Sequence, residues 1–128
     1  VEAAITSAKG AKAKFLAPFR CLQEFLAATG YRGCAFMNIA SEVPDCQSPL
    51  RKQGIRVYDA LGSQLIKLSE ALIASDPQRY ATLKSESLGR DYMMILAGAV
   101  ALAELYASDW PMQQGMKTLM GLIDGQKG

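Results

Sequence analysis

Apolar residues recur at intervals of three and four positions along most of this chain. That spacing places them on one face of an α-helix, and it is the main sign of helical structure in a sequence. No segment alternates apolar and polar residues between hairpin turns, so no β-strand is predicted. The pattern predicts an all-α bundle of five to six helices, over residues 1–8, 11–29, 34–43, 49–74, 77–107 and 110–124.

Proline and glycine mark several of the predicted helix ends. Gly30 is placed to cap the C-terminal end of the second helix. The pair Asp76 and Pro77 combines an N-cap side chain with proline at the first helical position, which predicts the start of the longest helix. Pro18 lies inside a predicted helix, where it removes one backbone hydrogen bond and predicts a kink near Lys14.

The most apolar stretch runs from Leu88 to Tyr106, and small residues are spaced through larger ones within it. Its uncharged part lies between Asp91 and Glu104, which is shorter than the about 20 apolar residues of a membrane span. No membrane association is therefore predicted. A helix that is apolar on nearly all sides has to be covered on nearly all sides. We expect one side to pack on this chain's own helices and another side on a second copy.

The small residues of this stretch predict the surface of a homodimer, because small side chains let two helices approach closely. The last two helices of each subunit would form a four-helix interface, in which both copies use the same patch. The alternative is that the last helix packs only on its own subunit. The predicted interface comprises Gly98, Ala99, Ala101, Leu102, Leu105, Met112, Met116, Leu119, Met120 and Ile123.

Composition narrows the function mainly by exclusion. The chain has 128 residues and a formal net charge of +2, which fits one globular domain without the basic stripe of a nucleic-acid-binding surface. It contains no histidine, so a Ser-His-Asp triad and metal ligation by histidine are excluded. No catalytic residue, metal or cofactor is predicted, and we expect that the chain is not an enzyme.

The cysteines give information about the cellular compartment of the protein rather than about a metal site. Cys21, Cys34 and Cys46 are odd in number and match no zinc spacing. Reduced thiols and the lack of a secretory signal predict a cytoplasmic protein. Cys34 opens a predicted helix, where thiols become reactive. A redox-sensing thiol and a small space-filling residue are the two interpretations of that position.

Aromatic and methionine side chains on four of the predicted helices can surround a cavity, and such a lining suits a small apolar ligand. Tyr58 and Tyr92 offer hydroxyls, and Asn38 offers an amide, that would orient a polar end of the ligand. Ordinary core packing is the alternative for each of these residues. The predicted lining comprises Phe15, Phe19, Leu22, Phe36, Met37, Asn38, Tyr58, Leu61, Tyr92 and Met93.

One segment carries a family resemblance. Residues 30–45 read GYRGCAFMNIASEVPD. This segment resembles the short-helix motif of the TetR family of bacterial transcriptional regulators. In that family a glycine, often followed by cysteine, opens a short helix that has an alanine-rich stretch, an acidic residue and a proline or aspartate stop. The matching positions are Gly33, Cys34, Phe36, Asn38, Ala40, Glu42 and Asp45.

The resemblance covers essentially the whole chain and implies that residues 1–128 are the C-terminal regulatory domain of such a protein, with a TetR-like helical fold. It implies a homodimer that binds a small, largely apolar effector and thereby releases DNA. The family's helix-turn-helix has no counterpart here, so DNA would be contacted only by an N-terminal domain that this chain lacks. The alternative is a free-standing helical carrier or interaction module without a DNA partner.

Overall fold

The computed structural model describes residues 2–31 and 49–125, and every regular element within these ranges is an α-helix. The all-α prediction is therefore confirmed for the described residues. The predicted helix over 34–43 lies outside them, as do residue 1 and residues 126–128. The described helices are α1 (Glu2–Ser7), α2 (Ala11–Ala28), α4 (Pro49–Ser75), α5 (Ser85–Tyr106) and α6 (Trp110–Asp124).

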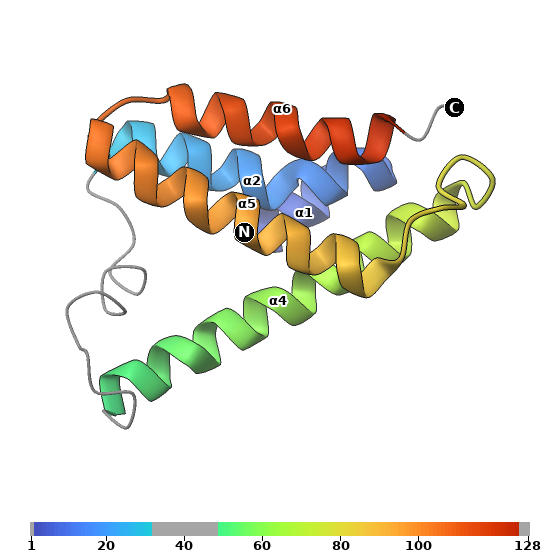
Figure 1. Cartoon of the computed structure of the whole chain (residues 1–128), viewed down its shortest axis with the longest axis horizontal. Coiled ribbons are helices and arrows are strands. Elements are labelled where there is room, and N and C mark those ends of the chain that lie inside the picture. The colour runs from blue at the N-terminus through green and yellow to red at the C-terminus, as the bar shows by residue number, and fades with distance from the viewer. Residues whose placement is uncertain (1, 32–48, 126–128) are drawn as a thin grey trace.

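Helices α2, α5 and α6 lie alongside one another, and α4 crosses this group while its first half extends away from it (Figure 1). Two contacts show that α2 and α6 run antiparallel. Lys12 at the start of α2 forms a 3.0 Å ion pair with Asp124 at the end of α6. Gln23 near the end of α2 donates a 3.0 Å hydrogen bond to Asp109, just before α6.

Helices α4 and α5 approach each other closely at two glycines. A Cβ added at Gly89 of α5 would lie 2.5 Å from Ile66 Cγ1 and 2.8 Å from Ile66 Cα. One turn further along, a Cβ added at Gly62 of α4 would lie 3.4 Å from the sulfur of Met93. Because the second pair is earlier on α4 and later on α5, the two helices are antiparallel.

The predicted start of the long helix at residue 77 is wrong, because α5 begins at Ser85. The start signal is followed only by turns over residues 77–82, in the first of which the Asp76 carboxylate accepts a 3.2 Å hydrogen bond from the backbone N–H of Arg79. In an unbroken helix Tyr80 would lie about 160° around the axis from Leu96, on the side away from the core. The turns instead let Tyr80 fold back, where it is buried.

The end of α2 confirms the predicted glycine cap. Gly30 has a positive φ of 67°, and the next N–H, of Tyr31, donates a 2.8 Å bond back to the carbonyl of Leu26. This is the Schellman arrangement, which suits glycine because a Cβ disfavours the left-handed conformation. At the end of α5 the equivalent position is Ala107, with a φ of 49°.

One hydrophobic core joins these helices, and α5 is central to it because α2, α4 and α6 all pack on α5. Helices α2, α4, α5 and α6 each contribute side chains to it at helical spacing. The largest fully buried side chains are Phe15, Phe19 and Leu26 of α2, Leu65 and Leu72 of α4, Tyr92, Leu96 and Val100 of α5, and Met112, Leu119 and Ile123 of α6.

Candidate functional site

The first candidate region is the part of the core where α5 meets the proline of α2. Pro18 has no N–H, so the carbonyl of Lys14 has no helical partner there. The hydroxyl of Tyr92 lies between the two groups that the next helical bond would join. It donates a 2.8 Å hydrogen bond to the carbonyl of Phe15 and accepts a 3.2 Å bond from the N–H of Phe19.

The rings around this hydroxyl are packed against one another. The centroids of Phe15 and Tyr92 are 4.9 Å apart with the planes at 65°, an edge-to-face contact. Phe19 lies 6.5 Å from Tyr92, and all three rings are fully buried. Burial raises the pKa of the Tyr92 hydroxyl far above its ordinary value, while the Phe19 N–H and Arg20 favour its ionised form. The hydroxyl is therefore held neutral and engaged by the backbone of α2.

Other members of the predicted ligand lining gather at the same core. Leu22, Leu61 and Met93 are half-buried and pack against it. Tyr58 is half-buried on α4. The remaining predicted members, Phe36, Met37 and Asn38, lie outside the described residues, so a ligand cavity bounded by the whole group stays a prediction.

The second candidate region is the outward face of α5. Five exposed positions follow one another at helical spacing on the side of α5 opposite to the core, and all five are apolar. A surface helix normally presents polar residues there. The side chains of two of them are about three-quarters exposed, at 75% for Met94 and 77% for Leu105. We call this face the outer stripe, and it comprises Met94, Gly98, Ala101, Leu102 and Leu105.

Two aromatic side chains extend the outer stripe at the turn between α5 and α6. Tyr106 is 58% exposed and Trp110 is 47% exposed. Their rings are in edge-to-face contact, with centroids 5.2 Å apart. Tyr106 and Trp110 were not among the predicted interface residues. Their position at the end of an apolar helix was the available signal, since large aromatic side chains are enriched at interfaces.

The structure divides the predicted dimer surface into two groups. Gly98, Ala101, Leu102 and Leu105 belong to the outer stripe, whereas Met116 and Met120 are half-buried against the chain's own core. Ala99, Met112, Leu119 and Ile123 are buried within the chain itself, so they are not available to a second copy. For these four residues the structure shows packing on the chain's own helices, which is the alternative given for the last helix.

A tight helix crossing inside the subunit accounts for the burial of Ala99. A Cβ added at Gly115 of α6 would lie 2.8 Å from the ring of Phe19 and 3.0 Å from the Cβ of Ala99. The small side chain of Ala99 therefore serves the contact between α5 and α6 of one chain. The most exposed positions of α6 include Gln113, Gln114, Lys117 and Thr118, which are polar.

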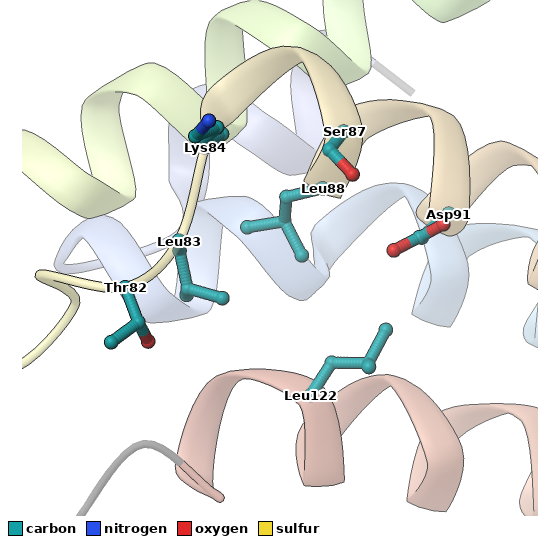
Figure 2. Close-up of a pocket in the computed structure, with 7 residues that line it drawn as sticks. All are labelled: Thr82, Leu83, Lys84, Ser87, Leu88, Asp91 and Leu122. Carbon is teal, nitrogen blue, oxygen red and sulfur yellow. The ribbon is translucent and has the colours of Figure 1, made fainter.

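A shallow groove of about 170 Å³ lies where α5 begins. Figure 2 shows Leu83 and Leu88 pointing toward Leu122 of α6, with Lys84 and Asp91 also lining the groove. A lysine and an aspartate at the same opening favour neither an anion nor a cation. No chemistry is assigned to this groove.

Reactive groups are sparse in the described ranges. Cys21 is a free, half-buried thiol, and Cys34 and Cys46 lie outside the described residues. Among the described residues no three acidic or cysteine side chains are grouped so that they could hold a metal ion. None of the described helices is long and apolar enough to cross a membrane.

Comparison of the chain with family models, with curated proteins and with solved structures finds no match. The resemblance to TetR regulators therefore depends on the sequence motif alone.

Proposed function

We propose that this chain is the effector-sensing and dimerisation domain of a TetR-like transcriptional repressor. The observation that supports this proposal best is the outer stripe of α5. Tyr106 and Trp110, each about half exposed, leave on the order of 200 Å² of aromatic surface in water, since a buried aromatic side chain removes 150–250 Å². An apolar surface of this kind on a folded domain is typical of a protein interface.

The order of side chains along the outer stripe favours a second copy of the same chain as the partner. Gly98 and Ala101 are small and lie near the middle, with Met94 on one side and Leu105 on the other. Two such helices related by a two-fold axis through the small residues would approach closely there, and the large side chains of each would pass beside the small ones of the other. The stripe contains no charged residue, so a copy meets no like charge.

Sensing is proposed for the core that α2, α4 and α5 share. Six members of the predicted lining lie in or against that core, and they are apolar or aromatic, so we propose a small, largely apolar effector. They are Phe15, Phe19, Leu22, Leu61, Tyr92 and Met93. The repressor would act in the cytoplasm as a homodimer. An effector that binds one arrangement of the two subunits better than the other would shift the population toward that arrangement. DNA-reading domains carried on a longer protein would then lose their alignment. We propose no enzymatic activity, because the sequence has no histidine and no motif of an activated nucleophile.

Self-association is tested by sedimentation equilibrium on the wild type and on Leu105→Glu. We expect the wild type to be a dimer at micromolar concentration and Leu105→Glu to be a folded monomer, because a buried unpaired carboxylate is costly. Ile55→Glu is the matched control, since Ile55 is also an exposed aliphatic side chain, at 50%, but lies on α4. A wild-type monomer, or a control that dissociates as readily as Leu105→Glu, would contradict the proposed interface.

Sensing and DNA control need a separate test. Thermal shifts with a panel of small apolar compounds should find one that raises Tm, and that compound should weaken operator binding by the longer protein. The coding sequence upstream of Val1 distinguishes the repressor from a free-standing carrier, because only the repressor requires a helix-turn-helix there. A dimer with ligand binding but no DNA-binding domain would favour the carrier.

A further inference from the structure

Helix α2 is held differently on the two sides of Pro18. On the N-terminal side, Lys12 pairs with Asp124 at the end of α6. On the C-terminal side, Gln23 bonds to Asp109 just before α6. Each half of α2 therefore has its own polar contact with the α6 region, an ion pair on one side and a hydrogen bond on the other. The backbone at Pro18, between the two halves, could open locally while both of these contacts remain.

At that junction, one side-chain hydroxyl is hydrogen-bonded to two backbone groups of α2. Proline leaves the junction short of one backbone bond, and the adjacent pair, the Phe19 N–H and the Phe15 carbonyl, is bridged by the Tyr92 hydroxyl. A side chain inserted into the backbone ladder in this way is one of the recognised devices by which a helix is bent. Here the inserted group comes from α5.

We propose that α2 is a hinged helix whose junction at Pro18 is latched by the Tyr92 hydroxyl of α5. With the latch closed, the two halves of α2 and the adjacent turn of α5 form one unit. Without the hydroxyl, the junction opens locally while the bundle stays folded. This inference goes beyond the proposed function and does not depend on it, since it concerns one helix within a single chain.

The hydroxyl matters here separately from the ring. Phenylalanine at position 92 would keep the ring and its contact with Phe15. It would leave the Phe15 carbonyl and the Phe19 N–H, both buried, without the oxygen that now bonds to them. The substitution removes one hydrogen bond from each of these two buried groups, and a lost buried hydrogen bond costs free energy, so the loss is concentrated at the junction.

Hydrogen exchange followed by NMR tests the latch. In Tyr92→Phe, we expect the Phe19 amide and its neighbours in α2 to exchange at least about tenfold faster than in the wild type. Amides of the α6 core, such as that of Leu119, should change by much less. Tyr80→Phe is the matched control. Tyr80 is also a buried tyrosine of the core, but it lies outside α2 and α5. It should not accelerate the α2 amides selectively.

A second variant ties the effect to the proline. Pro18→Ala supplies an N–H for the Lys14 carbonyl, so the junction no longer lacks that backbone hydrogen bond. Adding Tyr92→Phe to Pro18→Ala should therefore accelerate the α2 amides several-fold less than Tyr92→Phe does alone. If Tyr92→Phe does not fold, recovery of folding in the double variant supports the latch.

Three results would overturn the proposal. One is acceleration by Tyr92→Phe that is equal in α2 and α6, because that is ordinary loss of global stability. Another is no acceleration at all. The third is an equal effect of Tyr92→Phe with proline or alanine at position 18, including failure of both variants to fold, because the hydroxyl would then be unrelated to the proline junction.

Discussion

Replacing Gly89 by alanine tests the close contact between α4 and α5. A Cβ at this position would lie 2.5 Å from the Cγ1 of Ile66, 2.8 Å from its Cα and 2.9 Å from its backbone N. Non-bonded carbon atoms prefer separations of about 3.5–4.0 Å. A side-chain atom could rotate away, but the Cα and N of Ile66 belong to the backbone of α4. The two helices would have to separate by several tenths of an ångström or more.

In Gly89→Ala, the free-energy cost of overpacking is opposed by the gain in helix stability that usually follows when a glycine is replaced. Alanine inside a helix is favoured over glycine by about 1 kcal/mol. Overpacking a well-packed contact costs typically about 1–3 kcal/mol and occasionally more. Because two of the close atoms at Gly89 are backbone atoms, we expect the upper part of that range or beyond. The net expectation is a loss of about 2 kcal/mol in the free energy of unfolding.

The same helix provides the matched control at Gly98, where no heavy atom of residues 2–31 or 49–125 lies within 4 Å of an added Cβ. Chemical denaturation should show Gly89→Ala less stable than its parent by about 2 kcal/mol, and Gly98→Ala more stable by up to about 1 kcal/mol. Both are best measured in a Leu105→Glu background, where association at the outer stripe does not contribute. Equal stabilisation by the two substitutions would refute the close contact between α4 and α5.

Three further predictions concern a cap, an ion pair and an ionisable core group. Ala107→Gly should raise the free energy of unfolding by about 0.5–1 kcal/mol in thermal denaturation, because Ala107 has a left-handed φ of 49° and glycine removes that strain at some entropic cost. Asp124→Asn should lower the free energy of unfolding by about 1 kcal/mol at low salt, because Asp124 pairs with Lys12 at 3.0 Å and with Arg79 at 2.9 Å. This loss should be smaller at high salt, since the paired groups are partly exposed. Tyr92→Phe should flatten the alkaline decline of stability measured by urea unfolding. Burial raises the pKa of Tyr92 in the fold, so above pH about 10 only the unfolded chain releases this proton, and the wild type then loses stability as pH rises.

The spacing of apolar residues predicted the helices well where one face of the helix is buried and the opposite face is exposed. The start and end of α6 agree with the prediction, and α4 differs from it by one residue. The Gly30 cap was also predictable, because its cause is local: only a few residues around it decide the backbone conformation. The early start assigned to α5 failed because Asp76 starts a turn whether or not a helix follows. Tyr80 in these turns is buried in the core, and its burial depends on the packing of the whole bundle rather than on the local sequence.

The site was harder to predict than the helices, because a hydrophobic pattern says that a face is covered without saying by what. Ala99 and Ala101 are two residues apart in one small-residue segment, yet Ala99 is buried under α6 and Ala101 is exposed. The role of Tyr92 was equally hidden. Its hydroxyl was expected to face a ligand, and it instead bonds to the two backbone groups beside Pro18. Only the packing of α5 on α2 brings that hydroxyl to the proline.

The two glycines of α5 compared above make the case for a partner on physical grounds. Gly89 and Gly98 are nine residues apart, about two and a half helical turns, so they lie on opposite sides of α5. Glycine in a helix interior costs about 1 kcal/mol relative to alanine, and at Gly89 the backbone of α4 explains that cost. Nothing in the described part of the chain explains it at Gly98, whereas a second α5 crossing there would. Gly98→Ala should then stabilise the isolated subunit and weaken the dimer, two effects of opposite sign that separate on dilution. If the substitution stabilises the protein equally at all concentrations, no helix crosses at Gly98.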